Sequence, residues 1–207
     1  MSEYKDFREN VLYKISMTLL EYIVISVFVV FVSICSLGIL MFPAISSCYY
    51  YYYKRFKDKQ YVQFRILITG IKKNYKQTIP LGLVQLLILY IGYINHKNFG
   101  LFSSDSQILY YGIIGASLLL FLHNFYTLQL VTFFDVSLVK AINLSSYFLL
   151  AYIFSTLTII LLFVALVFSI FLQPVLITIV LGFFIHLSSR ILMAIFIKHS
   201  PKEDNDD

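Results

Sequence analysis

Charged residues are scarce in this chain and unevenly spread along it. Lysine, arginine, aspartate and glutamate make up 13% of its 207 residues, about half of the share that a soluble domain carries. None occurs in 77–96, 106–134 or 141–189, and Glu21 is the only one in 15–53. Because a helix needs about 20 mostly apolar residues to cross a bilayer core roughly 30 Å thick, these stretches predict membrane crossings.

The sequence also lacks the motifs of enzymes and metal sites. It has no glycine-rich phosphate loop and no metalloprotease or serine-hydrolase motif, and its four histidines lie far apart. Cys35 and Cys48 both lie in apolar surroundings, without the spacing of a metal or redox site. We therefore expect a protein that is not an enzyme, with no catalytic residues, no metal and no cofactor.

The apolar stretches predict an all-α, polytopic membrane helical bundle that forms a single domain over 1–200. Gln173-Pro174 divides the longest stretch, because proline is favoured just inside a helix start. The first stretch is ambiguous. It can form one long helix with an interfacial segment, or a hairpin of two short helices that turns near Gly38 and Pro43. With the hairpin, the crossings are about 15–36, 38–53, 77–95, 107–130, 147–171 and 174–197, and a disordered acidic tail follows at 201–207.

The distribution of basic residues decides between the two interpretations of the first stretch. Cytoplasmic loops are enriched in lysine and arginine; eight of these residues lie in 54–76 and three in 1–14. A hairpin places both groups in the cytoplasm, whereas a single first crossing separates them. We therefore predict six crossings, with both termini cytoplasmic. Five crossings with an outside amino terminus is the alternative, because acidic residues partly neutralise that terminus.

The basic segment at about 60–76 has the pattern of a cytoplasmic amphipathic surface helix. Its apolar residues recur at spacings of three and four and so share one helical face: Tyr61, Phe64, Ile68, Ile71 and Tyr75. Its cations lie mainly on the other faces: Arg65, Lys72, Lys73 and Lys76. Anionic lipid headgroups attract such a helix by about 1 kcal/mol per cation. The helix either anchors the chain to lipid or docks a transporter component. We expect no nucleic-acid partner, because the predicted cytoplasmic loops account for the basic charge.

Several polar side chains fall at about one depth in the six-crossing arrangement, nearer the cytoplasmic side. They are Glu21, Gln85, His123, Asn124 and Arg190, and His186 lies one turn before Arg190. An unpaired charge inside a membrane is costly, so we hypothesise a Glu21–Arg190 pair. His123, Asn124 and Gln85 would satisfy the remaining donors and acceptors of this pair. Alternatively, Arg190 extends to the headgroups and Glu21 lies in the interface.

Tyrosines are concentrated where this arrangement predicts the membrane surfaces. The five consecutive tyrosines at 49–53 would lie at the inner interface, and Tyr90, Tyr93, Tyr110 and Tyr111 at the outer one. Amphipathic rings prefer these depths. We therefore interpret the run of five as part of an aromatic interface belt.

Several short motifs resemble the YesL-like family of uncharacterised bacterial multi-pass membrane proteins. Members show a Gly-Pro-Ala-Thr-x-Ala-Leu-Tyr-Tyr segment, which is similar to 42–50 here, although Phe42 replaces the glycine and Ser46-Ser47-Cys48 departs from the pattern. The segment Lys73-Asn74-Tyr75-Lys76-Gln77 resembles a second family motif, and Phe134-Asp135 with Lys140 and Asn143 a third. The resemblance implies a bacterial cell membrane and a link to carbohydrate uptake, and it supplies no site residues.

Two functions follow from these observations. The first is a non-enzymatic accessory membrane protein linked to carbohydrate uptake, which acts through its basic helix. The second is a small transporter or permease subunit that uses the intramembrane polar layer as its path.

Overall fold

The computed structural model describes residues 11–58, 65–98, 107–134 and 136–199, and these form helices joined by short turns. Its helices are α2 (Val11–Cys35), α3 (Met41–Asp58), α4 (Arg65–Lys97), α5 (Gln107–Phe134), α6 (Leu138–Ala151), α7 (Ile153–Leu172) and α8 (Ile177–His199), with a short 3-10 turn, η3 (Pro174–Leu176), before α8. The predicted acidic tail at 201–207 lies outside the described residues.

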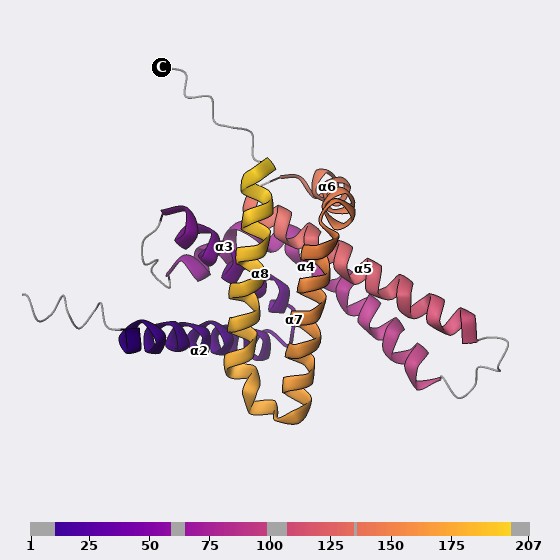
Figure 1. The fold of residues 1–207 in the computed structure, drawn as a ribbon, viewed down its shortest axis with the longest axis horizontal. Helices are drawn as coiled ribbons and strands as arrows, with labels where there is room; N and C mark the ends of the chain where they lie inside the picture. The colour runs from indigo at the N-terminus through magenta and orange to yellow at the C-terminus, as the bar shows by residue number, and fades with distance from the viewer. Residues whose placement is uncertain (1–10, 59–64, 99–106, 135, 200–207) are drawn as a thin grey trace, which may run out of the picture.

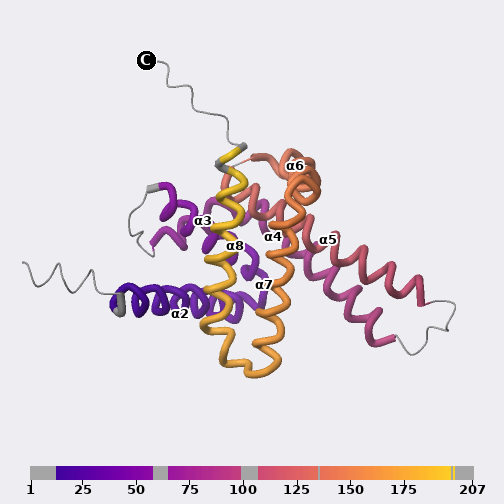
Figure 2. The backbone as a smooth tube through the Cα atoms, viewed as in Figure 1, coloured from indigo at the N-terminus to yellow at the C-terminus, as the bar shows by residue number. Residues whose placement is uncertain are grey.

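The helices are arranged as antiparallel pairs around α3. Figure 1 shows α4 and α5 leaning away together on one side, and α7 and α8 running side by side, while α2 crosses α8. The tube in Figure 2 follows the chain along α7, through the turn at 173–176 and back along α8. Gln173-Pro174 therefore stands at the turn between two helices, with the proline in the first turn of η3.

Five of the described helical segments are long and apolar enough to cross a membrane. They are Tyr13–Cys35, Arg65–Lys97, Gln107–Phe134, Ile153–Leu172 and Pro174–Phe196. The protein is thus an all-helical, membrane-embedded bundle. Helix α3 is not among the five, so the sixth crossing stays a prediction, as do the orientation of the termini and the membrane in which the chain resides.

The chain reverses direction between α2 and α3. Leu37 and Gly38 both have positive φ, 51° and 85°, and the amides of these residues donate to the carbonyls of Ile34 and Ser33. This is the hydrogen-bond pattern of a Schellman helix end. The Ser36 hydroxyl then accepts the Leu40 amide at 3.0 Å, just before α3 begins. The break predicted near Gly38 is therefore present, with Pro43 in the first turn of α3, where proline is tolerated.

Helix α3 occupies the centre of the bundle. It contacts α2, α4, α5 and α8, and Ala44, Cys48, Tyr49 and Tyr52 are completely buried. A helix enclosed by other helices needs no apolar surface, which explains how its tyrosine- and serine-rich sequence can lie inside a membrane protein. The interface-belt interpretation of 49–53 is wrong for Tyr49, Tyr51 and Tyr52, because these rings lie in the protein core.

The basic segment is not a separate helix from the crossing that follows it. Helix α4 is continuous from Arg65 to Lys97 and carries Pro80 in its interior. Its first turns pack on α3 through Leu67, Gly70 and Asn74, which are all buried. Ile68 and Tyr75, which we predicted on the apolar face of a surface helix, are both exposed; contact of this face with lipid stays a prediction. Tyr61 and Phe64 lie outside the described residues.

The predicted crossing at 147–171 differs from the structure at its start. The segment is divided at Tyr152, whose backbone has φ −120° and ψ 50°. The residues before the division belong to α6, which packs on α5, and the long apolar helix α7 starts only at Ile153. A run without charge gave no signal for this break.

The α2–α8 crossing supplies a first testable prediction. A methyl group added at Gly182 would overlap the Tyr22 carbonyl oxygen, so Gly182→Ala must push the two backbones apart. We expect a loss of about 1–3 kcal/mol of stability, measured as a lower thermal unfolding midpoint in detergent. The control is Gly92→Ala in α4, because nothing lies within 4 Å of the added group there. Equal midpoints for the two variants would contradict this packing.

Candidate functional site

An ion pair joins the two arms of the α2–α3 hairpin. The Arg55 guanidinium contacts the carboxylate of Glu21 through Nη1 and Oε2. Glu21 is buried, with 8% of its surface exposed, and its second oxygen, Oε1, has no hydrogen-bond partner within the described part of the chain. Glu21 precedes Gly38 by as many residues as Arg55 follows it, so an antiparallel hairpin that turns at Gly38 brings the two side chains level.

The hypothesised Glu21–Arg190 pair is not what the structure shows. Glu21 is paired with Arg55, and Arg190 is exposed, with its guanidinium carbon 5.7 Å from the centre of the Phe56 ring. We assigned Arg55 to a cytoplasmic loop, but α3 continues to Asp58 and keeps this residue on a helical face that meets α2. Glu21 thus has the cationic partner that a buried carboxylate requires, but this partner is Arg55 and not Arg190.

His186 lies beside this pair inside an aromatic shell. Its ring centre is 4.9 Å from that of Tyr52, 5.4 Å from that of Tyr22 and 5.8 Å from that of Phe56. Among the described residues, its Nδ1 has no hydrogen-bond partner. His186 therefore joins α8 to the α2–α3 hairpin mainly through ring packing. The first cluster comprises Glu21, Arg55 and His186, with Arg190 at its edge.

Gln85 and Asn124 form a second cluster between α4 and α5. The Asn124 amide nitrogen, Nδ2, donates to Gln85 Oε1 at 2.6 Å and to the Leu81 carbonyl oxygen at 2.9 Å. Both side chains are buried. We predicted that both side chains complete the hydrogen bonding of the ion pair; in the structure they bond to each other and to α4 instead.

His123 belongs to a third cluster, between α5 and α6. Its Nε2 lies 2.9 Å from the Ser145 hydroxyl and 3.0 Å from that of Ser146. The Thr127 hydroxyl donates to Ser145 at 3.0 Å. The six residues that we placed in one polar cluster are therefore divided among three helix interfaces, because each side chain contacts the helices nearest to it.

Sequence reasoning missed a further set of buried hydrogen bonds around α3. Ser46 bonds to Thr132 at 2.7 Å and accepts from Asn74 at 3.4 Å. The Tyr49 hydroxyl lies 2.7 Å from that of Ser188. These contacts link α3 to α4, α5 and α8. The available signal was the presence of small hydroxyl residues within apolar runs, which favours helix–helix contact in membranes.

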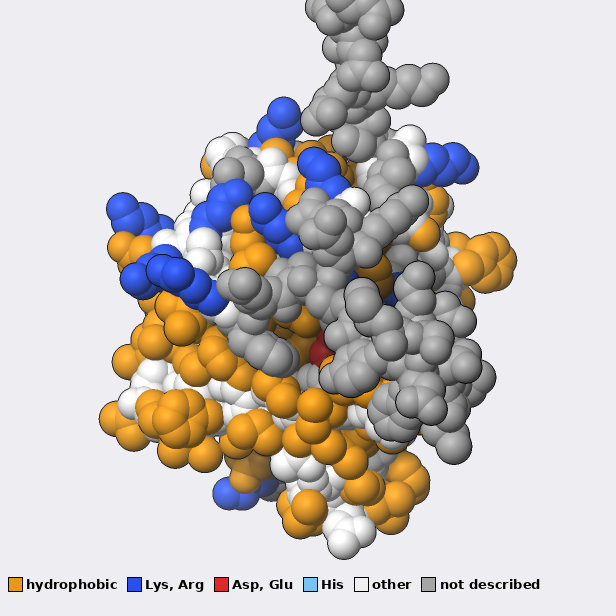
Figure 3. Space-filling view, turned by 90° about the vertical axis from the view of Figure 1, so that its left-hand side faces the viewer, with side chains coloured by type: hydrophobic (Ala, Val, Ile, Leu, Met, Phe, Trp, Pro, Cys, Tyr) orange, Lys and Arg blue, Asp and Glu red, His pale blue; other side chains and the backbone are white. Residues whose placement is uncertain are grey.

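The cations of the basic segment lie on the outer side of α4. Arg65, Lys72, Lys73 and Lys76 are all exposed, and the Lys73 ammonium is 5.5 Å from the centre of the Tyr50 ring. Figure 3 shows lysine and arginine side chains gathered on the upper part of one face, above a broad hydrophobic region. We call Arg65, Lys72 and Lys76, with Ile68 and Tyr75 beside them, the α4 basic face.

A charge exchange tests the pairing of Glu21. The single changes Glu21→Arg and Arg55→Glu each bring two like charges together, and we expect each to cost about 3 kcal/mol of stability. The double variant with both changes should recover most of this loss, measured as the thermal unfolding midpoint in detergent. The control double variant, Glu21→Arg with Arg190→Glu, should not recover it. Recovery in the control alone would assign Glu21 to Arg190.

The comparisons with known proteins match only the first part of the chain. Residues 18–96 match the model of a family described as "Protein of unknown function, DUF624". No curated protein matches the chain, and no solved structure does. The matched region covers most of α2, all of α3 and nearly all of α4, which are the helices that hold Glu21, Arg55 and the α4 basic face. The chain is thus similar, over the ion-paired hairpin and the basic helix, to a family without an assigned function.

Proposed function

We propose that this chain is a non-enzymatic accessory protein of a bacterial cell membrane, and that its α4 basic face contacts a cytoplasmic component of a carbohydrate uptake system. The observation that carries the proposal is the exposure of this face on a helix that is fixed to the core. Arg65, Lys72 and Lys76 are exposed, while Leu67, Gly70 and Asn74 on the opposite side are buried.

Close packing holds the α4 basic face in position. A methyl group added at Gly70 would lie 3.0 Å from the Ser47 Cα atom, which shows how closely α4 approaches α3. The Ser47 hydroxyl also donates to the Leu67 carbonyl. A partner that binds this face therefore meets a preorganised helix, which reduces the entropy lost on binding.

The composition of the α4 basic face suits a protein partner. Ile68 is 55% exposed and Tyr75 is 41% exposed, and both lie beside the cations. Aromatic and arginine side chains are enriched at protein interfaces, and cations favour an acidic partner. The resemblance to the YesL-like family supports the carbohydrate part of the proposal. Binding of anionic lipid by the same cations is the competing outcome.

The transporter alternative receives less support. It requires polar side chains to form a path, and the six candidate residues belong to three separate helix interfaces, as described above. We therefore retain the accessory role as the proposed function.

Charge reversal on the α4 basic face tests the proposal. The triple variant Arg65→Glu, Lys72→Glu and Lys76→Glu should no longer support carbohydrate uptake in cells that lack the wild-type chain, and its copurification with the uptake components in mild detergent should fall by about tenfold or more. The control triple variant, Lys14→Glu, Lys140→Glu and Lys198→Glu, changes the net charge equally at exposed sites elsewhere and should behave as wild type.

Two results would contradict the proposed function. In the first, both triple variants support uptake equally well. In the second, the basic-face variant loses only its retention of phosphatidylglycerol during purification, while uptake and copurification remain at the wild-type level. That result would assign the α4 basic face to lipid anchoring.

A further inference from the structure

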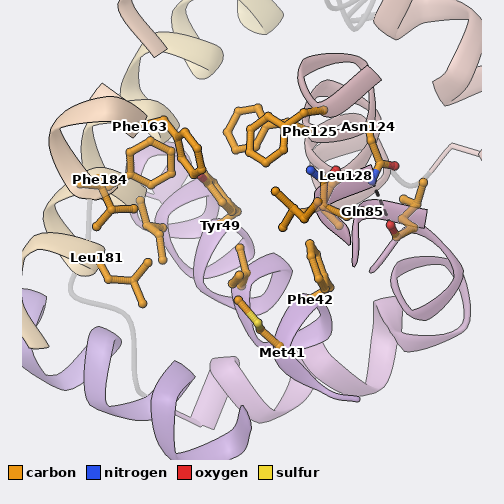
Figure 4. Close-up of a pocket in the computed structure, with 16 residues that line it drawn as sticks. Met41, Phe42, Tyr49, Gln85, Asn124, Phe125, Leu128, Phe163, Leu181 and Phe184 are labelled. Carbon is orange, nitrogen blue, oxygen red and sulfur yellow. Dashed lines mark hydrogen bonds between the residues drawn. The ribbon is translucent and has the colours of Figure 1, made fainter. Parts of the chain in front are cut away.

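A cavity of about 230 Å³ lies inside the bundle, away from the α4 basic face. Its wall is contributed by α3, α4, α5, α7 and α8 and is almost entirely apolar. Figure 4 shows Phe163 and Phe184 on one side and Gln85 and Asn124 on the other, with Phe125 between them. The cavity is thus formed where helices far apart in the sequence converge.

Gln85 contributes an unused hydrogen-bond donor to this cavity. The side chain is 4% exposed, and its Oε1 accepts the Asn124 amide. Its Nε2, on the same amide group, has no partner among the residues that the structure describes. A buried donor without a partner is unfavourable and rare in native proteins. We therefore expect Gln85 Nε2 to donate a hydrogen bond to an acceptor on a bound molecule.

The other side-chain donors on the wall are already engaged. The Tyr49 hydroxyl is bonded to Ser188, and the Asn124 nitrogen donates to Leu81 and Gln85. An occupant must therefore be apolar over most of its surface and must carry one acceptor for Gln85. Water alone fits poorly, since a buried water molecule needs two to four polar partners.

The size of the cavity limits the occupant. A cavity of about 150 Å³ binds benzene, so by proportion this one holds about nine non-hydrogen atoms. Met41 and Leu89, which also line it, are 37% and 49% exposed on the outside of the bundle. A hydrocarbon chain can therefore reach the cavity from the surrounding bilayer between α3 and α4.

We propose that this cavity binds a short hydrocarbon segment bearing an ester carbonyl, with Gln85 Nε2 donating a hydrogen bond to the carbonyl oxygen. The aromatic and aliphatic wall holds the hydrocarbon, and Gln85 selects the ester over a plain alkane. This proposal does not depend on the accessory function and uses none of the residues of the α4 basic face.

Tryptophan fluorescence can test the site, because the protein contains no tryptophan. Phe163→Trp places a reporter on the cavity wall, and Phe168→Trp on the same helix places a control at a site that is 63% exposed on the outside. Each variant is reconstituted in dioleoylphosphatidylcholine vesicles and titrated with methyl 6-bromohexanoate or 1-bromononane, since bromine quenches tryptophan.

We expect saturable quenching of the cavity reporter by the ester. Its apparent Kd, expressed per bilayer concentration, should be about fivefold lower than that of the alkane, which is the size of one neutral hydrogen bond. The outside reporter should show non-saturating quenching with both compounds. Identical curves for the two reporters, or saturation at equal Kd for ester and alkane, would overturn the proposal.

Removing the Gln85 amide donor provides a second test of the proposal. Gln85→Leu in the Phe163→Trp background should abolish the fivefold preference and leave alkane binding unchanged. If that variant does not fold because Asn124 loses its partner, the double variant Gln85→Leu with Asn124→Leu replaces both polar groups. Retention of the ester preference in a folded variant would overturn the role of Gln85.

The source of the ester is decided by repeating the titration in dodecyl maltoside, a detergent without an ester group. If added dioleoylphosphatidylcholine displaces methyl 6-bromohexanoate, the occupant is the acyl ester of a membrane lipid. If it does not, the occupant is a small free ester. Either result supports the site itself, whereas failure of saturable binding in both media overturns it.

Discussion

The ion pair between Glu21 and Arg55 depends on one geometric condition, which is that α2 and α3 run antiparallel. Glu21 is buried, and a carboxylate in an apolar environment requires a cation or must be neutralised. Only a turn centred near Gly38 brings Arg55 level with it. The positive φ values of Leu37 and Gly38 provide that turn. The turn at Leu37 and Gly38 and the ion pair between Glu21 and Arg55 therefore both require the same α2–α3 hairpin.

The position of α3 follows from this hairpin. Once α3 folds back along α2, its tyrosines and serines meet α4, α5 and α8 and find hydroxyl partners there, as Tyr49 does with Ser188. Helix α4 then packs closely on α3 through Gly70 and continues without interruption into an apolar segment. The exposed basic face and the internal cavity are both consequences of this packing.

The sequence was sufficient to predict a helical membrane bundle and the break near Gly38. Charge-free stretches, and a glycine followed five residues later by a proline, are local signals. The partner of Glu21 was not predictable in the same way, because it depended on α3 extending past 53. The contact between the basic segment and α3 was also not predicted. Apolar periodicity indicated only a face for the membrane surface, whereas α3 approaches so closely that the small and polar Gly70 and Asn74 form the contact.

Accessibility of the two ends of the hairpin tests the account most directly. In a variant without Cys35 and Cys48, single cysteines replace Lys14, before Glu21 on α2, and Lys57, after Arg55 on α3. Both are treated with a membrane-impermeant thiol reagent in sealed vesicles of known orientation. The hairpin predicts that both cysteines react from the same side of the membrane. Reaction from opposite sides would contradict the antiparallel α2–α3 arrangement on which the ion pair, the central position of α3 and the placement of α4 depend.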